Sequence, residues 1–136
     1  MRLVLDTSAL IAVVDANDRH HGRVRDALDT ERRHGAAFLL PALVLCEVEY
    51  VLRRENLARA IPALVGDVLS GAYRLECPVP QDLERALAIL GRWDVGLTDA
   101  TVAALAERSG NRVATLDHRD FRRLRTANGK PFELVP

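Results

Sequence analysis

Short runs of strand-forming residues alternate along this chain with segments that have the apolar spacing of helices. The runs that we expect to be strands are residues 2–5, 36–40, 73–77, 112–116 and 132–135, and most of the segments between them have helical periodicity. Strands that alternate with helices form a parallel sheet with right-handed crossover connections. The sequence therefore predicts a three-layer α/β/α architecture.

Length and composition fit one packed domain over residues 1–136. Of these residues, 49% are hydrophobic and 28% are charged, so the chain has enough apolar surface to bury a core. The 19 basic and 19 acidic side chains cancel, which argues against a general polyanion-binding protein but leaves local basic patches open. All but one of the basic residues are arginine. Arginine suits bidentate contacts with phosphate, although a biased genome composition explains the same skew.

Several classes of protein are excluded by what the sequence lacks. Cys46 and Cys77 have no metal-ligand spacing and are too few for a disulfide framework, so we expect a reducing, cytoplasmic setting. The four histidines form no paired ligand motif. No apolar stretch approaches the length of a membrane span, and the N-terminal apolar run lacks the features of a signal peptide.

Two expected helices carry specific predictions about their ends and faces. Asn56 is the expected N-cap of a helix over residues 56–70, and Pro62 is an irregularity within it because proline removes a backbone donor. A further helix covers residues 81–93. The residues that we expect on its inner side are Leu83, Leu87 and Leu90.

Three aspartates stand where a strand ends or a helix begins. Asp6 follows the first strand, Asp117 follows the fourth, and Asp99 lies in the first turn of a helix that Thr98 is expected to cap. Each has a plain structural explanation, because carboxylates at these positions accept bonds from free helical N–H groups and compensate the helix dipole. The carboxyl ends of parallel strands, however, are where open α/β sheets bind their ligands.

The fourth acid, Glu47, lies in the middle of the helix expected over residues 42–55. Its neighbours three and four residues away are Leu43, Val44, Tyr50 and Val51. On this face a buried carboxylate would cost several kcal/mol, of order, unless it were paired or bound to a metal. Glu47 is therefore expected either to join a site or to pair with an arginine, whereas Glu49 has Arg53 four residues on and fits a solvated ion pair.

Four carboxylates at one edge of a sheet would repel one another unless some were protonated or a cation lay among them. A site made only of oxygen ligands suits Mg²⁺ or Mn²⁺. Such an ion can polarise a phosphate and activate water, so the pattern favours phosphoryl transfer. The hydroxyls of Thr7, Ser8 and Thr98 are candidates to hold waters or the phosphate.

Two arginine-rich segments are candidates for contacts with nucleic-acid phosphates. Arg19 and Arg23 belong to the first, which also contains His20, His21 and Arg25, and Arg119 and Arg122 belong to the second, which also contains Arg123 and Arg125. A charged helix is more often only a solvated face, so both readings stay open for each arginine.

Four motifs resemble those of the PIN domain and, within it, of the VapC toxins of bacterial toxin–antitoxin pairs. In chain order they are LDTSALIA, CEVEYVL, GLTDA and TLDHRDF. The resemblance extends over essentially the whole chain and includes the closing FELVP. It implies a parallel sheet of five strands in the order 3-2-1-4-5.

The resemblance also implies an activity and its residues. VapC-type proteins are Mg²⁺- or Mn²⁺-dependent endoribonucleases that cut structured RNA, often tRNA or a ribosomal RNA loop. They are usually homodimers that a cognate antitoxin inhibits. The family's four acids fall on Asp6, Glu47, Asp99 and Asp117, and its small hydroxyl falls on Thr7 or Ser8. Asp120 is either an extra ligand or part of a helix cap, and we expect the dimer surface on the helices over 42–55 and 56–70.

Other functional classes fit less well. A haloacid dehalogenase-type phosphatase needs a second aspartate where this chain has Ser8. A signalling receiver domain needs an acid pair and a lysine at a late strand end, but Lys130, the only lysine, lies in a Gly-Lys-Pro turn. A PIN domain that binds RNA or a protein without turnover remains the alternative.

Overall fold

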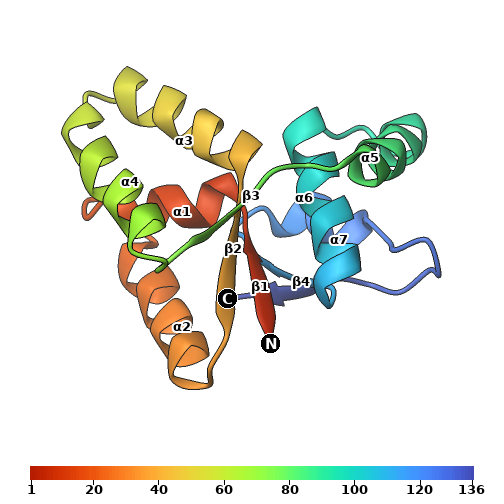
Figure 1. Cartoon of the computed structure of the whole chain (residues 1–136), viewed down its shortest axis with the longest axis horizontal. Coiled ribbons are helices and arrows are strands. Elements are labelled where there is room, and N and C mark those ends of the chain that lie inside the picture. The colour runs from red at the N-terminus through yellow and green to blue at the C-terminus, as the bar shows by residue number, and fades with distance from the viewer.

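The computed structural model describes all residues from 1 to 136 and contains a five-stranded parallel sheet (Figure 1). The strands are β1 Arg2–Leu5, β2 Ala37–Pro41, β3 Arg74–Glu76, β4 Arg112–Ala114 and β5 Glu133–Val135. Their order in the sheet is β3-β2-β1-β4-β5, and every neighbouring pair is parallel. The expected α/β class and strand order are therefore confirmed.

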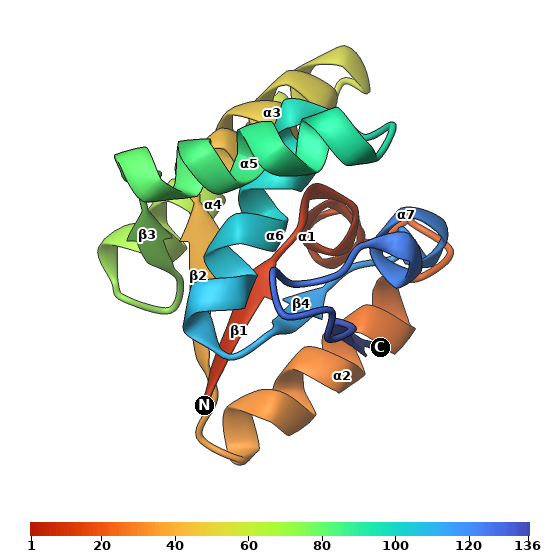
Figure 2. The ribbon, with the colours of Figure 1, turned by 90° about the vertical axis from the view of Figure 1, so that its right-hand side faces the viewer.

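Helices cover both faces of this sheet (Figures 1 and 2). Their bounds are α1 Thr7–Val14, α2 His21–Arg33, α3 Ala42–Arg54, α4 Ile61–Leu69, α5 Pro80–Arg92, α6 Leu97–Ser109 and α7 His118–Arg123. On one side α1 and α2 pack together, and on the other α6 packs on β1 and β4, with α5 outside it. Helix α3 leaves the carboxyl end of β2 and contacts both α1 and α6, so it lies along the edge where the strands end.

The core is densest around the central strand. Leu3, Val4 and Leu5 of β1 are fully buried, as expected for a parallel strand with helices on both faces. Helix α6 is buried on every side from Ala100 to Ala106, and four of these seven residues are alanine. Small side chains let α6 lie between the sheet and α5, which fixes the start of α6 near the end of β1.

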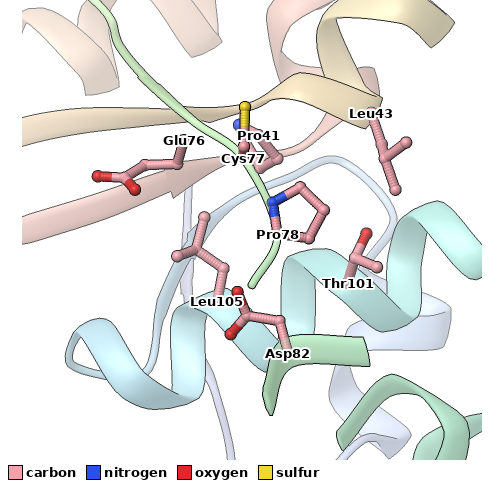
Figure 3. Close-up of a pocket in the computed structure, with 8 residues that line it drawn as sticks. All are labelled: Pro41, Leu43, Glu76, Cys77, Pro78, Asp82, Thr101 and Leu105. Atoms are coloured by element: carbon pink, nitrogen blue, oxygen red, sulfur yellow. The ribbon is translucent and has the colours of Figure 1, made fainter. Parts of the chain in front are cut away.

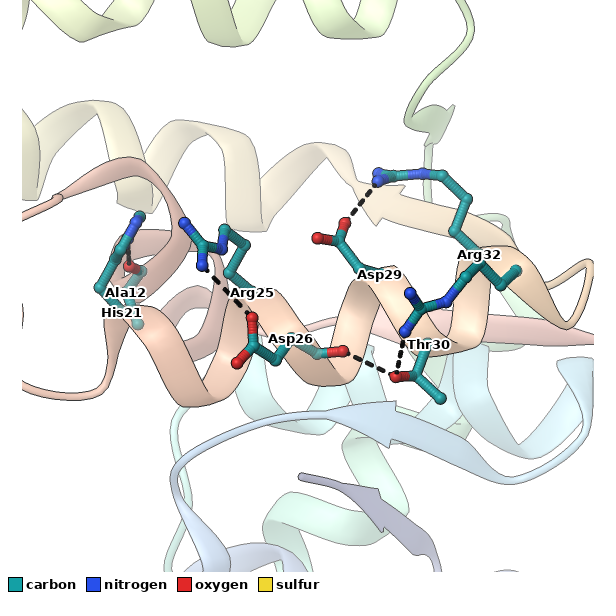
Figure 4. Close-up of polar contacts among 8 residues, drawn as sticks. Ala12, His21, Arg25, Asp26, Asp29, Thr30 and Arg32 are labelled. Atoms are coloured by element: carbon teal, nitrogen blue, oxygen red, sulfur yellow. Dashed lines mark hydrogen bonds and ion pairs between the residues drawn. The ribbon is translucent and has the colours of Figure 1, made fainter.

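A cluster of charged side chains joins α2 to the last two strands. The guanidinium of Arg112 donates two hydrogen bonds to the Glu31 carboxylate, at 2.8 and 2.9 Å, and one to Glu133 at 2.9 Å. These bonds are the main reason that the pKa of Glu31 lies below its ordinary value. The other ion pairs of α2 join neighbouring residues on its exposed surface, whereas His21 Nδ1 contacts the Ala12 carbonyl oxygen at 2.8 Å and ties α2 to α1 (Figure 4).

The expected N-cap of the helix over residues 56–70 is wrong. Asn56 caps no helix; it adopts a left-handed backbone with φ of 60°, and a 3₁₀ turn over Ala58–Ala60 precedes α4. Pro62 then lies in the first turn of α4, where its missing N–H has no intrahelical partner to lose. The helical segment expected over residues 56–70 is therefore divided beside Pro62, into a 3₁₀ turn and the helix α4.

The leucines of α5 face outward instead of inward. Leu83, Leu87 and Leu90 are 47%, 72% and 37% exposed, whereas the buried face of α5 consists of Asp82, Ala86 and Ile89. Helix α5 packs on the alanine-rich α6. Asp82 is buried there because Arg108 donates two hydrogen bonds to its carboxylate, at 2.7 and 3.0 Å.

We expect Arg112→Met to lower the free energy of unfolding by about 2–4 kcal/mol, because it leaves the Glu31 carboxylate without its partner. Arg25→Met should cost less than about 1 kcal/mol, because the Arg25–Asp26 pair is exposed. Urea denaturation of both variants measures the difference. Equal losses would show that the Arg112 cluster contributes no more than a surface pair.

Candidate metal centre

Asp6 lies at the junction of β1 and α1 and is only 2% exposed. It occupies the N-cap position of α1, yet its carboxylate accepts no bond from the helix N-terminus. Instead its Oδ2 accepts hydrogen bonds from Thr115 Oγ1 at 2.7 Å and from Ser8 Oγ at 3.1 Å. Its Oδ1 is buried and has no hydrogen-bond partner. The capping explanation therefore fails for Asp6, and one carboxylate oxygen is left free.

Three further aspartates gather beside this junction. Carboxylate oxygens of Asp99, Asp117 and Asp120 lie within 4.8 Å of one another. Asp99 belongs to the first turn of α6, and Asp117 is the N-cap of α7, where its side chain accepts a bond from the Asp120 amide at 3.2 Å. Asp120 also forms an ion pair with Arg123. Neighbouring β1 and β4 thus bring together acids that are more than ninety positions apart in the sequence.

The charges of these acids strongly affect one another. Burial, followed by the negative charges of Asp6, Asp117, Glu47 and Asp120, raises the pKa of Asp99 to about 7. Burial also raises the pKa of Asp6, against the lowering effect of the Thr115 hydrogen bond. Glu47 therefore lies close enough to Asp99 to share its electrostatic environment. Without a cation, the cluster is not fully ionised near neutral pH.

The donor set fits a hard divalent cation. It offers only carboxylate and hydroxyl oxygens, which Mg²⁺ and Mn²⁺ prefer. The buried Oδ1 of Asp6 has a lone-pair surface that nothing in the protein satisfies, and such atoms call for a bound ion or water. A cation would also relieve the repulsion that keeps Asp99 partly protonated.

Glu47 differs from the expectation in one respect, because its side chain is exposed. The buried stripe of α3 consists of Val44, Val48 and Leu52, so Glu47 lies beside this stripe and not on it. Tyr50, one of its supposed apolar neighbours, is 63% exposed. The Glu47 carboxylate therefore stays in contact with water and has no desolvation cost. Its connection to the cluster is its proximity to Asp99. Glu49 forms the expected ion pair with Arg53 at 2.8 Å.

The predicted hydroxyl residues have different environments. Ser8 takes part in the hydrogen bonds around Asp6, and Thr7 Oγ1 is buried without a partner. Thr98 does not cap α6, because Gly96 occupies the N-cap position, and the Thr98 carbonyl accepts a bond from Thr101 Oγ1 at 2.8 Å. The expectation that Thr98 caps this helix is therefore wrong.

The candidate RNA-binding arginines lie on the surface. Arg19, Arg23, Arg119 and Arg122 are exposed, and none forms an ion pair with a carboxylate. Arg119 and Arg122 belong to α7, the helix that begins at Asp117 and carries Asp120. The structure shows no direct contact between these arginines and the acids, and it leaves their charges available.

Sequence reasoning missed Thr115 and assigned Asp120 a minor part. Thr115 was expected inside an apolar strand, but β4 ends one residue earlier and the fully buried Thr115 side chain faces Asp6. A polar residue two positions before Asp117 was the available signal. Asp120 joins the cluster through its carboxylate, in addition to its amide contact with Asp117.

Two hollows lie near these elements. One, between the end of β2, the segment after β3 and α6, measures about 10 Å³ and holds no more than a water molecule (Figure 3). The other is an apolar groove of about 360 Å³ between α3 and α4. Its lining residues are Leu45, Cys46, Glu49, Ile61, Leu64 and Val65. Neither is lined by Asp6, Asp99, Asp117 or Asp120.

A parallel sheet in the order 3-2-1-4-5, with acids gathered where its central strands end, is the arrangement of a PIN domain. Residues 3–127 match the PIN domain family, and the chain belongs to it. None of its helices combines the length and apolar character that a membrane crossing requires.

Within this family the chain is a homologue of VapC-type ribonuclease toxins. Ribonuclease VapC26 of Mycobacterium tuberculosis is 29% identical over 138 residues, which cover 98% of this chain and all of that protein. The crystal structure of VapC20 from the same organism, a toxin that cleaves the sarcin–ricin loop, has a TM-score of 0.75 at 26% identity and covers 85% of this chain and 89% of its own. A toxin–antitoxin complex from Klebsiella pneumoniae shares the fold, with a TM-score of 0.68 at 16% identity over 88% of this chain and 89% of that one.

The raised pKa of Asp99 predicts how stability depends on pH. Between its ordinary value of 3.8 and about 7, the folded protein holds a proton that the unfolded chain has lost. The free energy of unfolding therefore falls as pH rises through this range. In EDTA, we expect wild type to lose about 1–3 kcal/mol more than Asp99→Asn across this interval.

Urea denaturation between pH 4 and pH 8 tests this expectation. Adding Mg²⁺ at pH 8 should restore stability to wild type and have little effect on Asp99→Asn, because the cation binds the folded acids. Parallel pH profiles for the two proteins would contradict the coupling.

Proposed function

We propose that this protein is a metal-dependent endoribonuclease toxin that hydrolyses a phosphodiester bond in structured RNA, acts in the cytoplasm and is inhibited by a cognate antitoxin. The observation that carries the proposal is the free, buried Oδ1 of Asp6 beside the cluster of Asp99, Asp117 and Asp120. The homology to VapC-type ribonucleases supports it.

Each acid has a proposed role. Asp6 and Asp99 are the principal ligands of Mg²⁺ or Mn²⁺, because burial raises the pKa of both carboxyl groups and Asp6 has a free buried oxygen. Asp117 and Glu47 complete the cluster or orient its waters, and Asp120 is an additional oxygen donor. A bound divalent cation would stabilise the charge that develops on the phosphate and help to activate water.

The remaining residues bind and orient RNA. Thr7 Oγ1, buried and unpaired, and Thr98 are suited to hold a water or a phosphate oxygen at the edge of the cluster. Arg119 and Arg122 on α7, and Arg19 and Arg23 before and within α2, supply local positive charge to a chain whose net charge is +0. Local patches without a basic excess favour a defined tRNA or ribosomal RNA structure over non-specific binding. The sarcin–ricin loop that VapC20 cleaves is the first candidate substrate.

Cleavage of total cellular RNA by the purified protein, freed of any partner, tests the activity. We expect discrete fragments with Mg²⁺ or Mn²⁺ and none with EDTA. Asp6→Asn and Asp99→Asn should each lower the rate by at least about 100-fold, because each removes a charged ligand. Asp67→Asn, which changes an exposed acid on α4 that forms no ion pair, serves as the matched control and should cut at the wild-type rate.

The same assay separates the proposal from its alternative, a PIN domain that binds RNA or a protein without turnover. RNA binding without metal-dependent cleavage would favour that alternative. Cleavage that persists in Asp6→Asn would contradict the assignment of the acids.

We further propose that the apolar groove between α3 and α4 binds an apolar segment of the antitoxin. Its walls come from both helices, and Glu49, its only charged lining residue, is already paired with Arg53. A groove of this kind fits an amphipathic helix or an extended apolar peptide. The toxin–antitoxin complex with the same fold supports a protein partner of this type.

The outward stripe of α5, formed by Leu83, Leu87 and Leu90, is the proposed contact between two copies of the chain. A contiguous apolar stripe on an amphipathic helix usually marks an interface. The stripe is flanked by exposed Glu84 near its beginning and exposed Arg92 near its end. Antiparallel pairing about a two-fold axis would therefore bring opposite charges together. The surface on α3 and α4 that the sequence suggested is the alternative location for the dimer contact.

We expect Leu87→Glu to convert a dimer to a monomer in light-scattering measurements, because two buried carboxylates would face each other across the axis. Val65→Glu, in the groove between α3 and α4, should leave the dimer intact but prevent co-purification of a co-expressed antitoxin. Each variant is the control for the other. A dimer that survives Leu87→Glu would contradict the α5 interface.

A further inference from the structure

Thr115 connects two of the clustered acids through a single hydroxyl group. Its side chain is fully buried directly after β4. Thr115 Oγ1 lies 2.7 Å from Asp6 Oδ2 and 2.9 Å from the Asp117 amide nitrogen. The amide can only donate, so the hydroxyl accepts from Asp117 and its single proton is directed to Asp6.

Ser8 adds a second hydroxyl to the same arrangement. Its Oγ accepts a bond from the Leu116 amide at 2.9 Å. Its proton is therefore available to Asp6 Oδ2, at 3.1 Å, or to Thr115 Oγ1, at 3.2 Å. Both hydroxyls converge on Oδ2, and neither is bonded to Oδ1.

This asymmetry determines how Asp6 can bind a cation. With Oδ2 held by two donors, the carboxylate cannot rotate about its Cβ–Cγ bond without breaking both hydrogen bonds. Oδ1 is then the only oxygen of Asp6 with an unused acceptor position, since it is buried and unpartnered. The same threonine hydroxyl also fixes the backbone that carries the Asp117 carboxylate.

We infer that Thr115 is a positioning residue that aims Oδ1 of Asp6 at the metal and sets its spacing from Asp117, with Ser8 as a secondary support. The inference rests on the proposed function only in assuming that the acids bind a divalent cation. Partners that orient metal ligands in this way commonly change metal affinity by about 10- to 100-fold.

Mn²⁺ titration by calorimetry tests the inference without depending on RNA cleavage. Thr115→Val keeps the shape of the side chain and removes its hydroxyl, and we expect it to weaken Mn²⁺ binding by about 10- to 100-fold. Thr115→Ser retains the hydroxyl and should bind Mn²⁺ with near wild-type affinity. Ser8→Ala should give a smaller loss than Thr115→Val.

Thr126→Val is the matched control. Thr126 is also buried, and its Oγ1 accepts a bond from the Lys130 amide at 3.0 Å, in a turn that contains none of the clustered acids. If Thr115 only accepted the hydrogen bond from the Asp117 amide, both valine variants would lower the free energy of unfolding. Thr115→Val would then weaken Mn²⁺ binding no more than Thr126→Val does. Wild-type Mn²⁺ affinity in Thr115→Val, or equal losses in both valine variants, would overturn the inference.

The other possible outcomes also support or overturn the inference. If Thr115→Val does not fold, reduced Mn²⁺ affinity in Ser8→Ala with normal affinity in Thr115→Ser supports the inference, and unchanged affinity in Ser8→Ala overturns it. A wild-type protein that binds Mn²⁺ but cuts no RNA refutes the proposed function. The Mn²⁺ affinities of the variants then still test whether Thr115 positions Asp6. A wild-type protein that binds no Mn²⁺ overturns both.

Discussion

A carboxylate that has almost no contact with water lies at the end of the central strand, and much of the surrounding structure compensates for it. Burial of an ionised group without partners costs several kcal/mol, of order. The Asp6 carboxylate accepts hydrogen bonds from the hydroxyl of Ser8, two residues away, and from that of Thr115, 109 residues later. These bonds satisfy only one of its two oxygens, so the remaining cost is relieved by protonation or by a cation. The stability of this fold and the proposed binding of a cation are therefore linked at one atom.

Much of the fold followed from pattern and motif. The alternation of strands and helices predicted the α/β class, the resemblance to PIN domains predicted the strand order, and strand ends and helix starts located Asp6, Asp99 and Asp117. Thr115 was missed because the sequence does not show where a short strand ends, and β4 stops one residue before it. A change of a single residue in that boundary converts an apparent core position into a contact with the site.

The errors on α3 and α5 share a physical cause. Helical spacing shows which residues share a face, but it does not show which face packs against the protein. Glu47 has apolar neighbours and is still exposed, because the buried stripe of α3 runs through Val44, Val48 and Leu52. On α5 the three leucines face outward, and the residues of its buried face are Asp82, Ala86 and Ile89. The outward leucines of α5 form an exposed apolar stripe, and this stripe is the surface proposed for contact with a second copy of the chain.

The backbone of Thr115 also forms a hydrogen bond, which joins it to the edge strand β5. Its backbone amide donates to the Val135 carbonyl at 2.9 Å, so the edge strand β5 holds the segment that carries the threonine. A growing chain on the ribosome acquires Asp6 and Glu47 before Thr115 and Asp117, and β5 after all four. The complete cluster can form only when nearly all of the described residues have been synthesised. The order of the elements thus delays assembly of the site during translation until the surfaces that would bind its partners have already been made.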